Sequence, residues 1–206
     1  MTYEEYFTGD NNNLSQCIFR QKDIKITVAV VSRRSGTTTT AFNLSDCLYE
    51  LGAKVSYTEA NGYNHLKDIA AYYELIKDSG ESFKYRGVEY YPYKQFPNDY
   101  NFNIFDIGVL NRNTLPIYKA CNVRILCSGS KPYEIPEYKK ALDSILELNI
   151  STVFNSCQEI GRTNLKKSVE NENIKEYFAD YSLNLFDGKV NEKIFKQILQ
   201  EYIIEI

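Results

Sequence analysis

The chain has little of the residues that build metal centres or covalent cross-links. Its 206 residues include one histidine, five cysteines and no tryptophan. His65 has no cysteine or serine partner near it in the sequence, so metal or catalytic-triad chemistry has little support. The cysteines are odd in number, widely spaced and never in a Cys-x-x-Cys pair, which suggests neither a disulfide framework nor a zinc site and indicates a reducing compartment. They are Cys17, Cys47, Cys121, Cys127 and Cys157.

The chain also lacks a surplus of positive charge and a long apolar run. Its formal net charge is −3, so we expect no direct binding to duplex nucleic acid. The amino terminus is acidic and polar where a secretory signal would be basic and then apolar, and no run approaches the roughly 18 apolar residues of a membrane span. The polar face of the last predicted helix mixes glutamate with lysine, so stable membrane binding is not expected. We therefore predict a cytoplasmic protein.

The sequence alternates apolar strands with amphipathic helices. ITVAVVS at 26–32 is short, continuous and β-branched, as expected of a central parallel strand. In the next segment apolar residues recur at spacings of three and four, and Gly52 stands where a helix C-terminal glycine belongs. These apolar residues are Ala41, Leu44, Leu48 and Leu51. A helix is therefore predicted directly after the first strand.

The same alternation continues to the end of the chain. The remaining predicted strands are 54–60, an extended pair within 83–93, 102–108, 123–129, 151–156 and 176–181. The remaining predicted helices are 63–78, 135–148, a polar stretch at 162–174 and a closing helix from Val190 to Ile203. This order predicts an α/β fold with a doubly wound, mostly parallel sheet and helices on both faces. We divide the chain into a polar N-terminal leader at 1–24 and a single domain at 25–206.

The loop between the first strand and the first helix, SRRSGTT at 32–38, has the outline of a phosphate-binding loop. In such sheets backbone N–H groups and the positive end of a helix dipole converge at this place. A Walker loop is written as Gly, four residues, Gly, Lys and then Ser or Thr. Gly36 and Thr38 match it, but Thr37 holds the lysine position and Val31 the first glycine position. Taken alone, the pattern fits an ordinary helix cap equally well.

The longer stretch GTTTTAFNLSDCLYELGAKVSYTEAN, which begins at Gly36, resembles the Min/Par family of deviant Walker ATPases. In that family a Gly-Lys-Thr-Thr-Thr-Ala-x-Asn-Leu-Ala helix leads through Gly-x-Lys-Val into a strand that ends in an acidic residue. The resemblance continues less specifically through FNIFDIG and TVFN, and covers about 26–156. It implies a P-loop NTPase fold and binding of ATP or ADP with Mg²⁺. The matching positions are Gly36, Thr38, Thr39, Thr40, Ala41, Asn43, Leu44, Gly52, Lys54 and Val55.

The departures from the family concern its two lysines. Thr37 replaces the loop lysine and Ser32 stands where the second, signature lysine lies, so the chain resembles a degenerate member without either. Arg33 and Arg34 replace the family's glycine pair. Their guanidinium groups could supply the missing charge to phosphate oxygens, or could lie in solvent. The residues that the resemblance assigns to the cofactor are Ser32, Arg33, Arg34, Ser35, Gly36, Thr37, Thr38 and Asn155.

Three polar residues at strand ends complete the candidate site. Glu59 corresponds to a catalytic carboxylate of the family, although an acidic residue there can also cap a helix. Asp106 ends an apolar strand and is the Walker B candidate, which would hold Mg²⁺ through water while Thr38 supplies a direct oxygen ligand. Asn155 could contact a base edge or form a turn. Glu59 and Asp106 are thus the predicted catalytic residues, and Thr38 and Asp106 the predicted metal residues.

The resemblance implies a nucleotide-binding or pseudo-ATPase switch that positions or assembles a bacterial machine, of partition, conjugation or pilus type. It would act through protein partners and possibly as a homodimer. One alternative is a slow Mg²⁺-dependent ATPase in which Arg33 or Arg34 replaces the lysine. Another is a structural interaction module with an empty loop. The tyrosine-rich run at 85–100 fits either a partner-binding edge or packing of a β extension.

Overall fold

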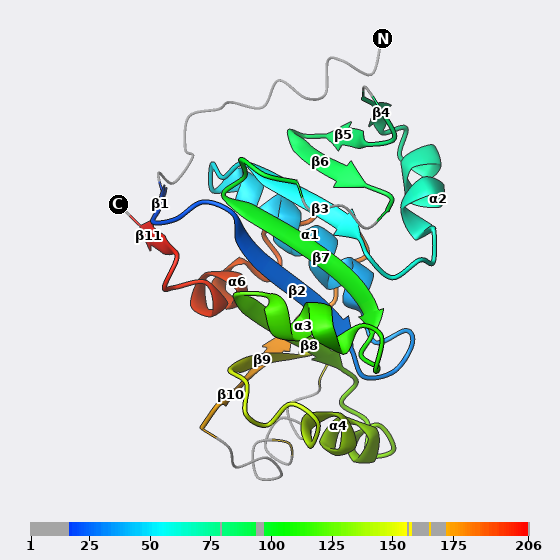
Figure 1. The fold of residues 1–206 in the computed structure, drawn as a ribbon, viewed down its shortest axis with the longest axis vertical. Helices are drawn as coiled ribbons and strands as arrows, with labels where there is room; N and C mark the ends of the chain where they lie inside the picture. The colour runs from blue at the N-terminus through cyan, green and yellow to red at the C-terminus, as the bar shows by residue number, and fades with distance from the viewer. Residues whose placement is uncertain are drawn as a thin grey trace.

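The computed structural model shows a nine-stranded sheet that is parallel over most of its width (Figure 1). The residues that the structure describes are 17–78, 80–93, 97–155, 157, 165 and 172–205. In spatial order the strands are β10 (Ile174–Ala179), β9 (Ile150–Asn155), β8 (Val123–Ser128), β2 (Ile24–Val30), β7 (Phe102–Val109), β3 (Val55–Glu59), β6 (Val88–Tyr91), β5 (Phe83–Tyr85) and β4 (Ile76–Lys77). Neighbouring strands from β10 to β6 are parallel, whereas β5 and β4 join antiparallel at the edge.

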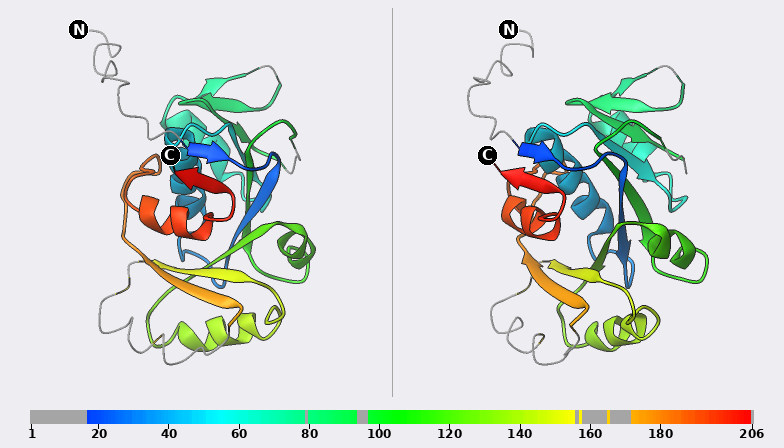
Figure 2. Two further views of the ribbon diagram at one scale, coloured as in Figure 1. Left: turned by 90° about the vertical axis from the view of Figure 1, so that its left-hand side faces the viewer. Right: turned by 60° about the vertical axis from the view of Figure 1, so that its left-hand side comes forward.

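Helices cover both faces of this sheet, as Figure 2 shows in two views. The described helices are α1 (Thr37–Glu50), α2 (His65–Tyr72), α3 (Leu115–Ala120), α4 (Ile135–Leu142) and α6 (Glu192–Ile198). Apolar residues of α1, α2 and α6 belong to one hydrophobic core and those of α3 and α4 to a second. The predicted doubly wound α/β fold is therefore confirmed. None of the helices described here has the length and apolar character that crossing a membrane requires.

A second, two-stranded sheet joins the two ends of the described chain. β1 (Cys17–Phe19) pairs antiparallel with β11 (Ile203–Glu205). β1 lies inside the segment that we predicted as a polar leader. The prediction of a closing helix as far as Ile203 is wrong, because α6 ends at Ile198 and the chain turns over Leu199 before it enters β11.

Two further elements differ from what the sequence predicted. The helix predicted over 63–78 ends at Tyr72, because Glu74 adopts a left-handed φ of 53° and β4 follows. Helix α3 was not predicted; its 6 residues are too few to show a helical period. The polar helical stretch predicted at 162–174 falls largely outside the described residues.

An aromatic cluster fastens α1 to the sheet and to the segment before α6. The ring of Phe42 on α1 lies 4.6 Å from that of Tyr57 on β3 and 5.1 Å from that of Tyr90 on β6, measured between centroids. Phe186 closes the cluster at 5.4 Å from Phe42. Such pairs add about 0.5 to 1.5 kcal/mol each beyond the burial of their surface. The start of α1 is therefore held by a rigid scaffold.

Candidate functional site

The backbone between β2 and α1 is shaped for a ligand at the start of the helix. β2 ends at Val30, and Gly36 is the N-cap residue of α1 with a left-handed φ of 89°. The left-handed backbone favours glycine, and a Cβ atom at this position would lie 2.6 Å from Nδ2 of Asn155 and would displace that side chain. No side chain caps the helix, and the first N–H groups of any α-helix lack intrahelical partners. The loop therefore does not form the ordinary side-chain cap that the sequence also allowed.

The predicted Walker B residue lies directly beside the loop. Asp106 on β7 is fully buried, and its Oδ2 accepts a hydrogen bond of 2.7 Å from the Thr38 hydroxyl. The same oxygen accepts a bond of 3.1 Å from the Tyr57 hydroxyl, and Oδ1 accepts the backbone N–H of Gly108 at 3.0 Å. The structure thus brings Thr38 and Asp106 together as predicted, and it adds Tyr57.

Tyr57 was not predicted because nothing in the local pattern distinguishes it from an ordinary core residue. It occupies the middle of β3, a strand in which all five residues are buried. Burial raises the pKa of its hydroxyl well above the ordinary value of 10. Tyr57 is therefore a hydrogen-bond donor to Asp106 at neutral pH. Its role follows from the pairing of β3 with β7, which is visible only in the folded chain.

Glu59 ends β3 next to this group, and both of its carboxylate oxygens have backbone partners. Oε1 accepts the N–H of His65 at 2.8 Å and Oε2 accepts the N–H of Leu66 at 3.2 Å. The carboxylate thus binds the first turn of α2, where the helix dipole favours negative charge. Burial nevertheless outweighs these two bonds and raises the pKa of Glu59 above 4.5. Its catalytic role stays a prediction.

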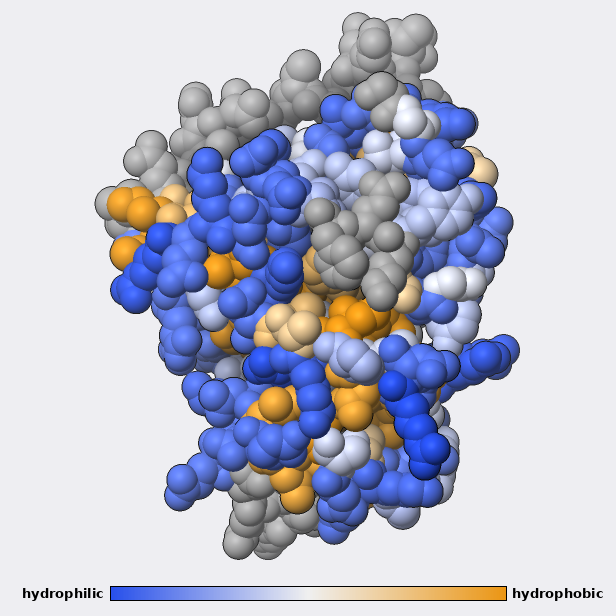
Figure 3. Space-filling model, viewed as in Figure 1, coloured by the Kyte–Doolittle hydropathy of each residue, from blue (hydrophilic) through white to orange (hydrophobic). Residues whose placement is uncertain are grey.

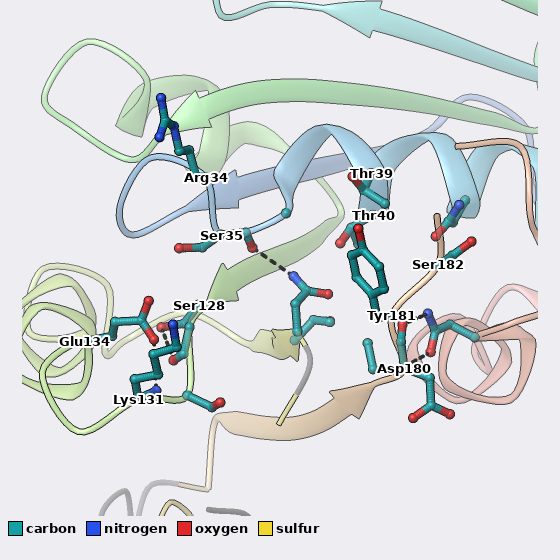
Figure 4. A pocket seen from close by; sticks show the side chains of 18 of the residues that line it. Arg34, Ser35, Thr39, Thr40, Ser128, Lys131, Glu134, Asp180, Tyr181 and Ser182 are labelled. Carbon is teal, nitrogen blue, oxygen red and sulfur yellow. Dashed lines mark hydrogen bonds between the residues drawn. The ribbon is translucent and has the colours of Figure 1, made fainter. Parts of the chain in front are cut away.

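Asn155 supports the loop from the end of β9. Its Nδ2 donates a hydrogen bond of 2.8 Å to the carbonyl oxygen of Ser35, drawn as the upper dashed line in Figure 4. Ser35 also lies 3.3 Å from Ser32, oxygen to oxygen. Asn155 therefore holds the backbone of the loop in this conformation. Contact with a nucleotide base stays a prediction.

The two arginines of the loop are exposed. Arg34 adopts a left-handed φ of 69°, and the guanidinium of Arg33 lies 5.5 Å from the centre of the Tyr63 ring. In Figure 4 the side chain of Arg34 points away from the cavity that contains Tyr181. Among the described residues neither arginine has an ion pair. Both cations are thus exposed beside the loop, without an acidic partner among the described residues.

Two cavities meet at this loop and share Arg34, Gly36 and Thr39 in their walls. The first cavity, of about 480 Å³, lies on the side of Asp106 and is also lined by Thr37, Thr38 and Asp106. The second, of about 320 Å³, lies on the side of Asn155 and is the one drawn in Figure 4. The loop between β2 and α1 therefore borders a cavity on each of its two sides.

Several walls of the smaller cavity come from strand ends that sequence analysis did not select. Ser128 ends β8, and Asp180 and Tyr181 follow β10. Figure 4 shows the Tyr181 ring pointing toward Thr40 of α1. Their position at the carboxyl ends of parallel strands is the one signal that could have found them. It is shared by every strand of the sheet and does not single out these residues.

A third cavity lies away from these two. Apolar side chains gather over the region of α3 and α4 in Figure 3, where a groove of about 450 Å³ lies between Leu115 on α3 and Ala141 on α4. Val31 and Leu110 also line this groove. None of the predicted site residues lines it, so the loop cavities remain the candidate functional site.

Comparison with known proteins supports the assignment of the fold. No protein-family model matches the sequence, and no curated protein matches it. A plasmid partition protein from Borrelia burgdorferi is 11% identical over 88% of this chain and 98% of that chain, with a TM-score of 0.61. A chain of the MinC:MinD cell division protein complex from Aquifex aeolicus is 12% identical over 89% and 98%, with a TM-score of 0.60. A nucleotide-binding protein from Archaeoglobus fulgidus, in complex with ADP, is 13% identical over 83% and 88%, with a TM-score of 0.51.

The chain therefore has the fold of the Min/Par-type P-loop NTPases. The matches cover most of this chain and of each of the three other chains. The fold predicted from the residues around Gly36 is confirmed. At 11% to 13% identity these matches show the fold alone. The chemistry of the loop is therefore argued from the residues of this chain.

The raised pKa of Glu59 makes its contribution to stability depend on pH. Because the folded state holds this proton more tightly than the unfolded chain, the contribution is fully present below about pH 4.5 and is lost as the pH rises through the folded-state pKa. Glu59→Gln removes the titration. Urea unfolding at several values between about pH 4 and about pH 7 should show the variant gaining stability relative to the wild type as the pH rises. A difference that does not change with pH would contradict the effect of burial on this carboxyl.

Proposed function

We propose that this protein is a nucleotide-binding switch that binds ATP or ADP with Mg²⁺ through its degenerate phosphate loop. The observation that carries the proposal is the meeting of two cavities at the uncapped start of α1, beside the Thr38–Asp106 pair. A helix N-terminus of this kind binds phosphate through its N–H groups and its dipole. The larger cavity would take the phosphates and the smaller one the base.

The oxygen atoms beside the loop fit Mg²⁺. This cation prefers oxygen ligands, keeps several waters, and is usually bound by one or two carboxylates together with substrate phosphates. The Thr38 hydroxyl donates its hydrogen bond to Asp106, which leaves the lone pairs of its oxygen available to a cation. Thr38 would thus bind the cation directly and Asp106 would bind its waters. When bound, Mg²⁺ neutralises charge on the phosphate oxygens.

Hydrolysis should be negligible or very slow, which makes the protein a pseudo-ATPase switch. The loop lysine position holds Thr37 and the signature lysine position holds Ser32, so two cations of the family are missing. Arg33 and Arg34 are the remaining cations of the loop. If one of them takes over the role of the lysine in the transition state, the protein would be a slow ATPase instead. If neither binds phosphate and the loop stays empty, it would be a structural interaction module.

As a switch, the protein would position or assemble a bacterial machine through protein partners. The proposal is supported by its fold, which it shares with a plasmid partition protein and with a chain of a cell division protein complex. A homodimer and a cytoplasmic location belong to the same proposal. The machine would be of partition, conjugation or pilus type.

The arginines should supply the positive charge for nucleotide binding. Replacing Arg33 and Arg34 together by alanine should weaken binding of Mg-ATP by roughly tenfold or more, because a charged hydrogen bond contributes about 1.5 to 3 kcal/mol. The melting temperature without nucleotide should hardly change, since exposed charges contribute little to stability. Isothermal titration calorimetry of wild type and variant measures both affinities.

Lys22→Ala combined with Lys175→Ala is the matched control. Both lysines are exposed and lie at the opposite edge of the sheet, at or before the start of their strands. This variant carries the same change in net charge and should bind Mg-ATP like the wild type. Equal affinity in the arginine variant would show that Arg33 and Arg34 do not contact phosphate. Absence of binding by the wild type at millimolar nucleotide would favour the structural module.

Phosphate release by the wild type should lie near background. The threonine at position 37 is neutral and too short to reach oxygens that develop charge in the transition state, and each such lost contact costs about 2.7 to 4 kcal/mol, or roughly a hundredfold to a thousandfold in rate. Thr37→Lys should tighten ATP binding without necessarily restoring turnover, because Ser32 leaves the second lysine position vacant.

The control for turnover is Asp106→Ala, which removes the carboxylate beside Thr38. Phosphate release should be equally low in this variant and in the wild type. Robust wild-type turnover that Asp106→Ala abolishes would contradict the pseudo-ATPase and establish the arginine-assisted ATPase.

A further inference from the structure

We propose that Tyr57 is the positioning residue of the Asp106 carboxylate, and that its hydroxyl holds Oδ2 in the orientation that hydrated Mg²⁺ requires beside a bound nucleotide. The inference rests on the nucleotide-binding function proposed above. It names a residue of β3 that lies outside the phosphate loop and does not line either cavity at the loop.

The two side-chain hydrogen bonds to Asp106 come from different parts of the fold. Thr38, which donates to Oδ2 at 2.7 Å, belongs to the first turn of α1 and lies at the wall of the larger cavity. Tyr57, which donates to the same oxygen at 3.1 Å, lies in the sheet with only 1% of its surface exposed. The bond from Tyr57 therefore does not depend on the conformation of the loop, whereas the bond from Thr38 does.

The ring of Tyr57 cannot easily move its hydroxyl away from Asp106. It packs 4.6 Å from the ring of Phe42 and 5.5 Å from that of Tyr90, between centroids. Close packing of this kind restricts a buried side chain to one arrangement. A side chain whose position is fixed by packing is a suitable outer partner for a carboxylate that must be pre-oriented.

Packing alone does not explain the hydroxyl. A phenylalanine at position 57 would fill the aromatic cluster equally well and would remove a polar atom from a fully buried place. Tyr90, in the same cluster, shows the contrast: its hydroxyl is buried and makes no hydrogen bond within the described structure. Among these two tyrosines, only the hydroxyl of Tyr57 is directed at a carboxylate of the candidate site.

Tyr57→Phe tests the inference, with Tyr90→Phe as the matched control. The measurement is the affinity for AMPPNP by calorimetry, once with excess MgCl₂ and once with excess EDTA. The dissociation constant in EDTA divided by the dissociation constant in MgCl₂ reports how strongly Mg²⁺ is bound in the complex. Loss of an outer partner typically weakens metal binding by about tenfold or more, so this ratio should fall by about that factor in Tyr57→Phe. Affinity in EDTA should stay unchanged, and Tyr90→Phe should resemble the wild type in both conditions.

A wild-type ratio in Tyr57→Phe would overturn the inference. The inference also fails if the wild type binds AMPPNP equally well with and without Mg²⁺, while nucleotide binding itself would stand. If the wild type binds AMPPNP in neither condition, the proposed function fails and the inference fails with it.

A double-mutant cycle tests the contact without nucleotide. Urea unfolding is compared for the wild type, Tyr57→Phe, Asp106→Ala and the double variant. If the hydroxyl acts on Asp106, the effect of Tyr57→Phe should be clearly smaller in the Asp106→Ala background. Additive effects would show that the two side chains do not interact, and would overturn the positioning role even if Mg²⁺ binding changed.

Discussion

The hydrogen bond of 2.7 Å between Thr38 and the buried carboxylate of Asp106 is the contact on which the candidate site depends. It joins the first turn of α1 to β7, the strand that lies next to β2 in the sheet. A charged acceptor in a buried place makes such a bond stronger and makes its loss more costly than at the surface. This bond fixes the start of α1 relative to β7. The loop is thereby held at both of its ends, by β2 on one side and by the first turn of α1 on the other.

The loop retains the backbone features of a phosphate site while its charge differs from that of the family it resembles. Gly36 keeps its left-handed conformation and its close contact with Asn155. The N–H groups of the helix start have no side-chain cap. The cations of the loop are Arg33 and Arg34, and both are exposed. Binding through N–H groups and dipole needs no lysine, whereas transition-state stabilisation does depend on well-placed charge. This difference is the physical reason to separate nucleotide binding from hydrolysis in this protein.

Much of the fold could be predicted because its signals are local. The β-branched run at 26–32 and the apolar spacing after Gly36 each lie within a few residues, and they gave β2 and α1 in the right order. Asp106 was selected because FNIFDIG resembles the Walker B strand of the family, and the structure places it beside Thr38, although β7 continues past it to Val109. The contacts of Tyr57 and the pairing of β1 with β11 could not be predicted in this way, since each joins segments far apart in the sequence. The place of Glu59 at a strand end could be predicted, but its role could not, because an acidic residue there can either cap a helix or act in catalysis.

The most direct test of the account is a crystal structure of the protein grown with AMPPNP and MgCl₂. We expect phosphate oxygens at the N–H groups of residues 34–38, Mg²⁺ bound to Thr38 with Asp106 on its waters, and the base in the cavity beside Tyr181. Nucleotide bound elsewhere, or a loop that stays empty at saturating AMPPNP, would contradict it.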